Sequence, residues 1–230
     1  MTTALRASGV WFRYGPAAWT LEDVTADFGP GVTAVVGPNG SGKSTLLRLV
    51  MGLRAPARGA VTMGGTPVVS MRASDRASQM AYIAQRPEVS AGFSVREVVE
   101  LGRFALRRDD RAIEGAMDAL GILSVADRPW RELSVGQQQL VSVARAVAQL
   151  GGPDAERGAL VADEPTGAMD PVHAARTIGV VRTMADRGVA VVLVAHDVSL
   201  ARAAADRALL VGAGGRIAGQ GPAREMLAPA

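Results

Sequence analysis

The stretch Gly-Pro-Asn-Gly-Ser-Gly-Lys-Ser-Thr, residues 37–45, decides how the rest of this 230-residue chain is interpreted. It fits the phosphate-loop pattern of Gly, four residues and Gly-Lys-Ser/Thr, in which backbone N–H groups hold phosphate oxygens. The glycines Gly37, Gly40 and Gly42 let the backbone curl without Cβ clashes. Lys43 is the only lysine among 25 basic residues, so this site uses a compact ammonium where the rest of the chain uses arginine.

The residues around this loop predict a strand before it and a helix after it. Val32–Val36 is a short β-branched run typical of a buried strand, and Leu46–Val50 has helical spacing. This order aims a helix N-terminus at an anion. We therefore predict that Lys43 bridges terminal phosphates and that the Ser44 hydroxyl holds Mg²⁺, although a glycine-rich turn with a solvated lysine is the alternative. The predicted nucleotide contacts of the loop are Gly37, Pro38, Asn39, Gly40, Ser41, Gly42, Lys43, Ser44 and Thr45.

Composition limits the classes of protein that the chain can belong to. Apolar residues make up 48% of it, and no cysteine is present, which excludes disulfides and thiolate metal sites and suits a reducing cytosol. The net charge is +3 and the arginines are scattered, which does not favour nucleic-acid binding. The longest apolar run, Val189–Ala195, is far shorter than a membrane helix, and the N-terminus shows no signal pattern. We expect one soluble domain over residues 1–230.

Hydrophobic periodicity predicts strands alternating with helices, which indicates an α/β fold with a mostly parallel sheet. The expected strands are Val10–Tyr14, Leu21–Phe28, Val61–Met63, Pro67–Val69, Met80–Ala84, Leu160–Ala162, Val189–Ala195 and Ala208–Val211. The expected helices are Gln138–Leu150, Pro171–Asp186 and Val198–Ala205. A helical insertion runs from Phe93 to about Arg131, and with the helix that follows it covers about residues 93–150. A capping box of Ser94 and Glu97 supports it, and Pro153–Gly158 is the expected surface loop.

Polar side chains at strand ends predict the second half of the site. Asp163 and Glu164 follow an apolar strand, and such strands deliver acids to the ligand-binding edge of a parallel sheet. Asp163 can orient Mg²⁺ and Glu164 can accept a proton from water, although acids after a strand are often a helix cap. Gln85 and His196 also end strands. Gln85 can touch Mg²⁺ or the water, and His196 can reach a γ-phosphate, while an ordinary structural role is the alternative for both.

A second anion-binding element lies about 90 residues further along the chain. Ser134 is a good helix N-cap, and Gly136 and Gln137 follow it where backbone N–H groups are exposed at a helix N-terminus. Nothing in the spacing shows that this element and the phosphate loop serve one nucleotide.

The order of these motifs resembles the nucleotide-binding subunits of ATP-binding cassette (ABC) transporters, from Tyr14 to beyond His196. The resemblance implies the P-loop ABC ATPase fold, with an N-terminal antiparallel β subdomain and an inserted α-helical subdomain. It implies that Tyr14 stacks on adenine, that Glu164 is the catalytic base, and that His196 is the switch histidine. Lys43 and Gln85 join them as catalytic residues, and Ser44, Gln85 and Asp163 form the implied metal site.

The same resemblance makes residues 133–137 a signature motif that binds the γ-phosphate held by an opposite subunit. It therefore implies a homodimer or heterodimer of ATPase subunits, head to tail, with two ATP molecules between them. Two departures stand out. Val135 replaces the first signature glycine, although Ser134 and Gly136 remain, and Met169 replaces a common leucine in the D-loop of residues 167–170. We expect altered packing or coupling rather than a dead site.

The segment 93–103 resembles importers of metal ions or metal chelates. The implied protein is an ATPase subunit that works with transmembrane permease subunits on the inner face of the cell membrane. An external substrate-binding protein is a further partner that the resemblance allows. An exporter subunit, a non-transport ABC ATPase, a small-molecule kinase and a non-hydrolysing ATP-binding module are the alternatives. The single cassette, the second anion-binding element and the intact Glu164 disfavour the last three. The motifs encode neither the cargo nor the direction of transport.

Overall fold

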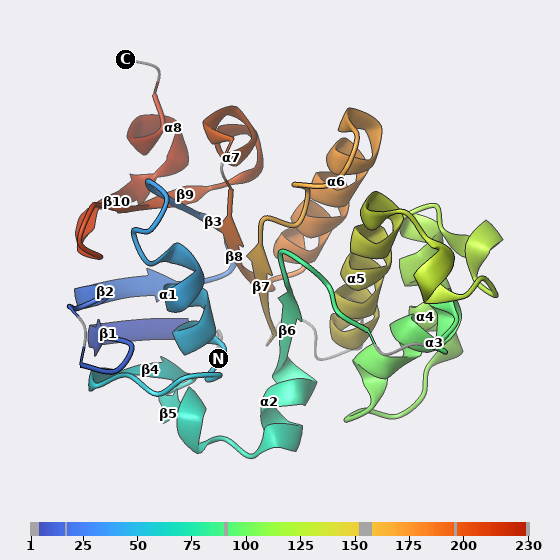
Figure 1. Ribbon diagram of the computed structural model, residues 1–230, viewed down its shortest axis with the longest axis horizontal. Coiled ribbons are helices and arrows are strands. Elements are labelled where there is room, and N and C mark those ends of the chain that lie inside the picture. The colour runs from blue at the N-terminus through green and yellow to red at the C-terminus, as the bar shows by residue number, and fades with distance from the viewer. Residues whose placement is uncertain (1–4, 17, 90–91, 152–157, 196, 229–230) are drawn as a thin grey trace.

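The computed structural model describes residues 5–16, 18–89, 92–151, 158–195 and 197–228. Two sheets organise this part of the chain (Figure 1). The first is a four-stranded antiparallel sheet in the order β2-β1-β4-β5. Its strands are β1 (Leu5–Phe12), β2 (Leu21–Phe28), β4 (Arg58–Met63) and β5 (Thr66–Pro67).

The second sheet is six-stranded, in the order β10-β9-β3-β8-β7-β6, and only its β9–β10 pair is antiparallel. Every residue of β7 and β8 is buried, as expected for parallel strands covered on both faces. Its strands are β3 (Gly31–Val36), β6 (Met80–Ile83), β7 (Ala159–Asp163), β8 (Ala190–Val194), β9 (Arg207–Val211) and β10 (Ile217–Pro222).

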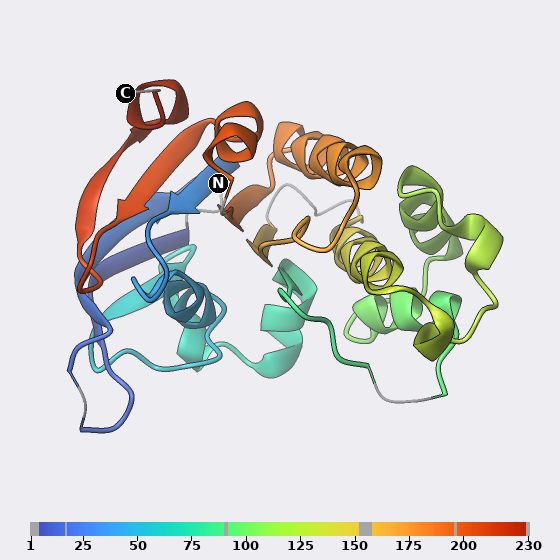
Figure 2. The same cartoon turned by 45° about the horizontal axis from the view of Figure 1, so that its top comes forward.

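Helices cover both faces of this sheet (Figure 2). One face carries α6 (Pro171–Asp186), α7 (Val198–Ala204) and α8 (Ala223–Met226), and the other carries α1 (Lys43–Val50) and the antiparallel sheet. The short helix α2 (Ala73–Gln79) precedes β6. A large hydrophobic cluster joins the antiparallel sheet, α1 and the parallel strands, so the phosphate loop is fixed at the centre of the protein.

A group of helices lies beside the β6 edge of the parallel sheet (Figure 1). It contains α3 (Val95–Glu100), α4 (Asp110–Ala119) and α5 (Val135–Leu150), with short 3₁₀ turns at Leu101–Arg103, Leu123–Val125 and Trp130–Glu132. The Ser94–Glu97 capping box is present at the start of α3. Because α5 packs on both α4 and β6, it connects these helices to the sheet.

The structure confirms the predicted fold class and corrects several element bounds. Val10–Tyr14 is wrong at its C-terminal end, because β1 stops at Phe12 and Tyr14 follows in the loop. The strand predicted at Pro67–Val69 has wrong bounds: β5 covers Thr66–Pro67 and pairs with β4, and Val68–Ser70 form a 3₁₀ helix that buries Val68. Helix α5 begins three residues before the predicted Gln138. Residues 153–157 of the predicted surface loop lie outside the described ranges, and the division of the chain into subdomains stays a prediction.

Three elements escaped the sequence analysis. The helices α2 and α8 are short, and β10 reads Ile-Ala-Gly-Gln-Gly-Pro, which lacks the apolar alternation of a strand. Pairing with β9 supplies the backbone hydrogen bonds that the residues of β10 would not favour alone. Among the described residues no helix is long and apolar enough to cross a membrane.

A carboxylate joins the parallel sheet to the helices on one face. Asp206 accepts a 2.7 Å bond from the backbone N–H of Val32 and a 2.8 Å bond from the Arg182 guanidinium. Burial alone would raise the pKa of Asp206, but these two donors outweigh it and hold that pKa below its ordinary value. The carboxylate therefore ties the first residues of β3 to α6 and to the start of β9.

Replacing Asp206 by alanine should lower the free energy of unfolding by about 2 kcal/mol at pH 7: the bond from Val32 to a charged group contributes about 1.5–3 kcal/mol, and the pair with Arg182 adds little because the Asp206 side chain is 47% exposed. Because the folded-state pKa is depressed, this contribution is complete above about pH 4 and is lost as the pH falls through the lower folded value. Urea unfolding at several pH values measures it. Asp27→Ala, which breaks an exposed pair with Arg6, is the control and should cost less than about 1 kcal/mol. Equal losses in both variants would contradict the role of Asp206.

Candidate functional site

The phosphate loop, Gln85 and Glu164 open onto one cavity of about 490 Å³. These residues come from three parts of the chain, and the parallel register brings them together. Ile83 pairs with Ala162 and Asp163 pairs with Val194, so the strand ends that carry Gln85 and Glu164 lie side by side. Its lining residues are Thr20, Asn39, Gly40, Gly42, Lys43, Ser44, Thr45, Gln85 and Glu164.

Lys43 is held inside the curl of the loop. Its Nζ donates to the carbonyl oxygens of Gly37 and Pro38 at 2.8 and 2.9 Å, and the residue is only 6% exposed. Gly42, at φ 94°, is the N-cap of α1 and offers no side-chain bond to the first N–H groups of the helix. Backbone donors and a buried ammonium thus face the same cavity, which is an anion-binding arrangement.

Close packing makes Gly37 necessary. A Cβ on Gly37 would lie 2.1 Å from the backbone oxygen of Val211 in β9, which is closer than any real contact. The end of β9 therefore supports the loop from behind. The sequence pattern identified Gly37 as conformationally permissive, but this contact shows that a lack of volume is the stricter requirement.

The donors around Asp163 fit a magnesium ion. Asp163 is 4% exposed, and its Oδ1 has no hydrogen-bond partner in the described part of the structure. Burial raises the pKa of Asp163, and the nearby Glu164 charge adds to this effect, while a hydrogen bond from Ser44 opposes it. A buried carboxylate oxygen without a partner, beside a hydroxyl, is a ligand set that Mg²⁺ accepts together with phosphates.

Glu164 has a strained backbone. Its φ of 50° lies in the left-handed region, which costs a residue other than glycine on the order of 1–3 kcal/mol. The surrounding structure enforces it, because the Glu164 N–H donates to Val194 and its carbonyl accepts from Gly167. Gln85 Nε2 donates to the Glu164 carboxylate at 2.9 Å. The left-handed backbone turns the carboxylate toward the cavity, and no sequence pattern predicted this conformation.

The residues of the predicted second anion-binding element lie away from this cavity. Ser134 and Gln137 form a capping box at the start of α5, and none of Ser134, Gly136 and Gln137 lines the cavity. A Cβ on Gly136 would lie 2.8 Å from the oxygen of Ala168, so the tip of α5 packs on the segment that follows Glu164. Val135 is 63% exposed at this tip. Asp170 caps α6 through Val172 and His173.

Tyr14 lies at the edge of the phosphate-loop helix rather than inside the cavity. Its hydroxyl is 3.4 Å from the Thr45 hydroxyl and accepts a 3.2 Å bond from Arg48. His196, the remaining predicted site residue, lies outside the described residues. The structure therefore brings Lys43, Gln85 and Glu164 together, and leaves the signature residues on another surface.

One residue near the site was missed by the sequence analysis. Gln139 in α5 is 1% exposed, and its Nε2 donates to the oxygen of Ala84 at 3.1 Å. It therefore holds the backbone immediately before Gln85 and links the signature helix to the cavity. Gln139 is the last of three consecutive glutamines, and nothing in the sequence distinguishes it from the other two.

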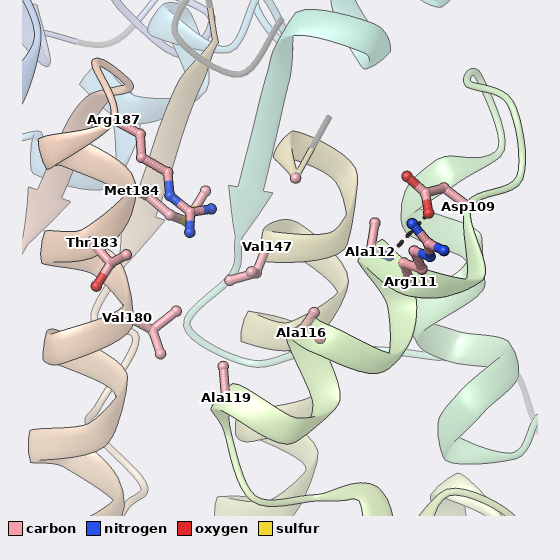
Figure 3. Close-up of a pocket in the computed structure, with 12 residues that line it drawn as sticks. Asp109, Arg111, Ala112, Ala116, Ala119, Val147, Val180, Thr183, Met184 and Arg187 are labelled. Carbon is pink, nitrogen blue, oxygen red and sulfur yellow. Dashed lines mark hydrogen bonds between the residues drawn. The ribbon is translucent and has the colours of Figure 1, made fainter. Parts of the chain in front are cut away.

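A second cavity, of about 390 Å³, lies between α4, α5 and α6 and shares no lining residue with the first (Figure 3). Its walls are largely apolar, with Ala116, Val147 and Val180 among the side chains that face it. It offers no glycine loop and no buried ammonium. The phosphate site is therefore the first cavity.

The pattern that defines ABC transporters matches residues 21–167. Two hemin import ATP-binding proteins are similar to this chain, from Gloeobacter violaceus and Pseudomonas putida. The first is 41% identical over 90% of this chain and 78% of its own length, and the second is 40% identical over 83% and 76%. A cobalamin import ATP-binding protein of Halobacterium salinarum is 39% identical over 91% of this chain and 53% of its own length.

Solved structures show the same fold. A dimeric bacterial ABC transporter cassette superposes with a TM-score of 0.84 at 24% identity, covering 96% of this chain and 99% of its own. The cbiO1 protein of Clostridium perfringens, part of an ABC transporter complex, gives a TM-score of 0.82 at 23% identity, covering 99% and 92%. This chain belongs to the ABC transporter family, and it is an ATP-binding cassette of that family.

Replacing Gly37 by alanine should weaken ATP binding by more than tenfold, because the methyl group would collide with the Val211 carbonyl and displace the loop. Gly179→Ala in α6 is the control, since a Cβ there meets nothing within 4 Å, and it should keep ATP affinity and gain up to about 1 kcal/mol of stability. Isothermal titration with ATP measures the affinities. Unchanged ATP affinity in Gly37→Ala would show that the loop does not hold the nucleotide as described.

Proposed function

We propose that this chain is the ATP-hydrolysing subunit of a transporter that imports a metal chelate, and that it acts on the inner face of the cell membrane with permease subunits. The observation that carries the hydrolysis is the shared cavity of Lys43, Gln85 and Glu164. The printed functions of the relatives, hemin and cobalamin import, support the class of cargo.

The proposed reaction is ATP and water to ADP and phosphate, in which positioning and charge neutralisation lower the barrier. The loop N–H groups and Lys43 hold the phosphates. Glu164 orients a water molecule and accepts its proton, and Gln85 fixes the Glu164 carboxylate through the 2.9 Å bond. Mg²⁺, held by Ser44, Asp163 and Gln85, would neutralise phosphate charge. His196 would contact the γ-phosphate.

Two chains complete each site in this proposal. Ser134, Gly136 and Gln137 stand at an exposed helix N-terminus away from the cavity, so they can serve a nucleotide held by another subunit. Because Gly136 packs on the backbone of Ala168, a displacement of the first residues of α5 would move the segment that follows Glu164. The partner is a second copy of this chain or a related subunit.

This chain has a surface that suits the membrane partner. We propose that the permease subunit docks in the groove of about 370 Å³ between α2, the 3₁₀ turn at Leu101–Arg103 and α5. Phe104 is 75% exposed on its rim, beside the exposed Leu53 and Leu101. Arg145 also lines the groove. Burial lowers the pKa of Arg145, and the described residues give its guanidinium no hydrogen bond or ion pair.

Such a groove suits an amphipathic segment that carries a carboxylate. Its exposed apolar rim would be covered by the apolar face of that segment, and a carboxylate would pair with Arg145. The permease subunit that carries this segment could receive its cargo from an external substrate-binding protein, and that protein would not touch this chain.

Glu164→Gln should lower the turnover of ATP by about 10²–10⁴-fold, because a general base contributes about that factor. ATP affinity should stay within about threefold of the unchanged protein, since the phosphate loop is intact. Phosphate release and equilibrium binding of ATP measure the two quantities. Full turnover in this variant would reject Glu164 as the base, and the control Glu225→Gln on α8 should leave both unchanged.

Arg145→Met should weaken assembly with the permease subunits of the same gene cluster by about 30-fold, the loss expected for an interface arginine worth about 2 kcal/mol. The isolated chain should be as stable as before or more stable, because a desolvated charge without a partner is removed. Co-purification in detergent and thermal unfolding measure these effects. The exposed Arg224→Met is the control, and unaltered assembly in Arg145→Met would move the partner elsewhere.

A further inference from the structure

The hydroxyl of Tyr14 is tied to the phosphate-loop helix by two residues of α1. Arg48 Nη1 donates to it at 3.2 Å, and the Thr45 hydroxyl lies 3.4 Å away. Thr45 follows Ser44 directly and lines the phosphate cavity, so the ring is attached to the wall of that cavity. Tyr14 comes from the loop after β1, about 30 residues earlier, and these contacts are what join that loop to α1.

The ring is held at its other end as well. The Phe12 ring meets it edge to face, with centroids 4.9 Å apart and planes at 87°. Tyr14 nevertheless stays 42% exposed. Contacts at the hydroxyl and with the Phe12 ring fix the tyrosine ring, and its remaining exposed surface is available for a flat partner.

The rest of the loop is anchored independently. The guanidinium of Arg13 lies 4.7 Å from the centroid of the Trp19 ring, and that of Arg58 lies 5.7 Å from it. The Trp11 ring packs against the Trp19 ring in a T-shaped arrangement. Cation–π contacts of this kind stabilise exposed loops modestly. Since Arg13 is adjacent to Tyr14, this cluster fixes the backbone from which the tyrosine projects.

We propose that Arg48 is a positioning residue which, with Thr45, holds Tyr14 as a fixed platform on which the base of the nucleotide stacks. This inference rests on the proposed function, because it assumes that ATP occupies the phosphate loop. It adds a role for Arg48, which does not line the cavity and reaches the base of the nucleotide through the tyrosine.

The energetic reason is preorganisation. An exposed aromatic side chain that must be ordered when the ligand binds loses part of the stacking free energy, and a ring already fixed does not. Releasing one side chain of this kind corresponds to a weakening of roughly threefold to tenfold. The loss should fall on the base alone, because the phosphates are held by the loop and Lys43.

The test compares ATP with inorganic tripolyphosphate, which offers the phosphates without a base. In Arg48→Met, the affinity for ATP should fall roughly threefold to tenfold and the affinity for tripolyphosphate should not change. The KM for ATP should rise by the same factor with little change in kcat. Tyr14→Phe, which loses the hydroxyl but keeps the ring, should reproduce this pattern, and the double variant should be no worse than either single one.

A spectroscopic measurement checks the tether itself. The chain has only two tyrosines. The hydrogen bond with Thr45 and the Arg48 guanidinium lower the pKa of Tyr14, whereas burial raises the pKa of Tyr82. Ultraviolet titration should therefore show two separated ionisations. Tyr14→Phe should remove the lower one, and Arg48→Met should move it upward, while the persistence of the higher one shows that the variant is folded.

The outcomes separate this inference from the proposed function. If the unchanged protein binds tripolyphosphate and ATP equally, or binds neither, the proposed nucleotide site fails. If it prefers ATP and Arg48→Met keeps that preference, the positioning role of Arg48 fails. Tighter ATP binding by Arg48→Met also overturns it, because the tether would then hold the ring out of the base position. Arg224→Met should match the unchanged protein throughout.

Discussion

The burial of one ammonium group inside a curl of glycine-rich backbone is the constraint on which the rest of the structure depends. Lys43 is held by the carbonyls of Gly37 and Pro38, in a loop that β9 supports through the contact of Gly37 with Val211. Among the described residues the hydrogen-bond partners of Lys43 are neutral carbonyls, and a buried cation of this kind is satisfied best when an anion joins it. The loop is therefore stable as a fold element, and a phosphate group would complete it electrostatically.

The parallel sheet brings the side chains of the proposed catalysis to this loop. Parallel strands end at one edge, so a register that pairs Ile83 with Ala162 places Gln85 beside Glu164. The left-handed backbone at Glu164 then turns its carboxylate to the cavity at a cost that the sheet and the Gly167 contact sustain. Strain, register and burial thus act together on two side chains that are 79 positions apart.

The helix α5 connects the parts of the proposed machine. Its first residues belong to the predicted second anion-binding element, and Gln139 and Gln149 donate to the backbone at the two ends of β6. Arg145, between them, faces the groove proposed for the membrane partner. A displacement of α5 would move the residues 134–137, the backbone before Gln85 and the groove together. The proposed coupling of transport to hydrolysis requires such a connection.

Local patterns in the amino-acid sequence were enough to predict the phosphate loop, the strand-end acids and the alternation of strands and helices, because each depends on neighbouring residues or on short-range periodicity. Folding in three dimensions was needed to show that Gln85 bonds Glu164, that Glu164 is strained, that Arg48 holds Tyr14 and that β10 is a strand. These features depend on strand register and on close packing between distant segments. A one-residue shift of register would change all the partners without changing any local pattern.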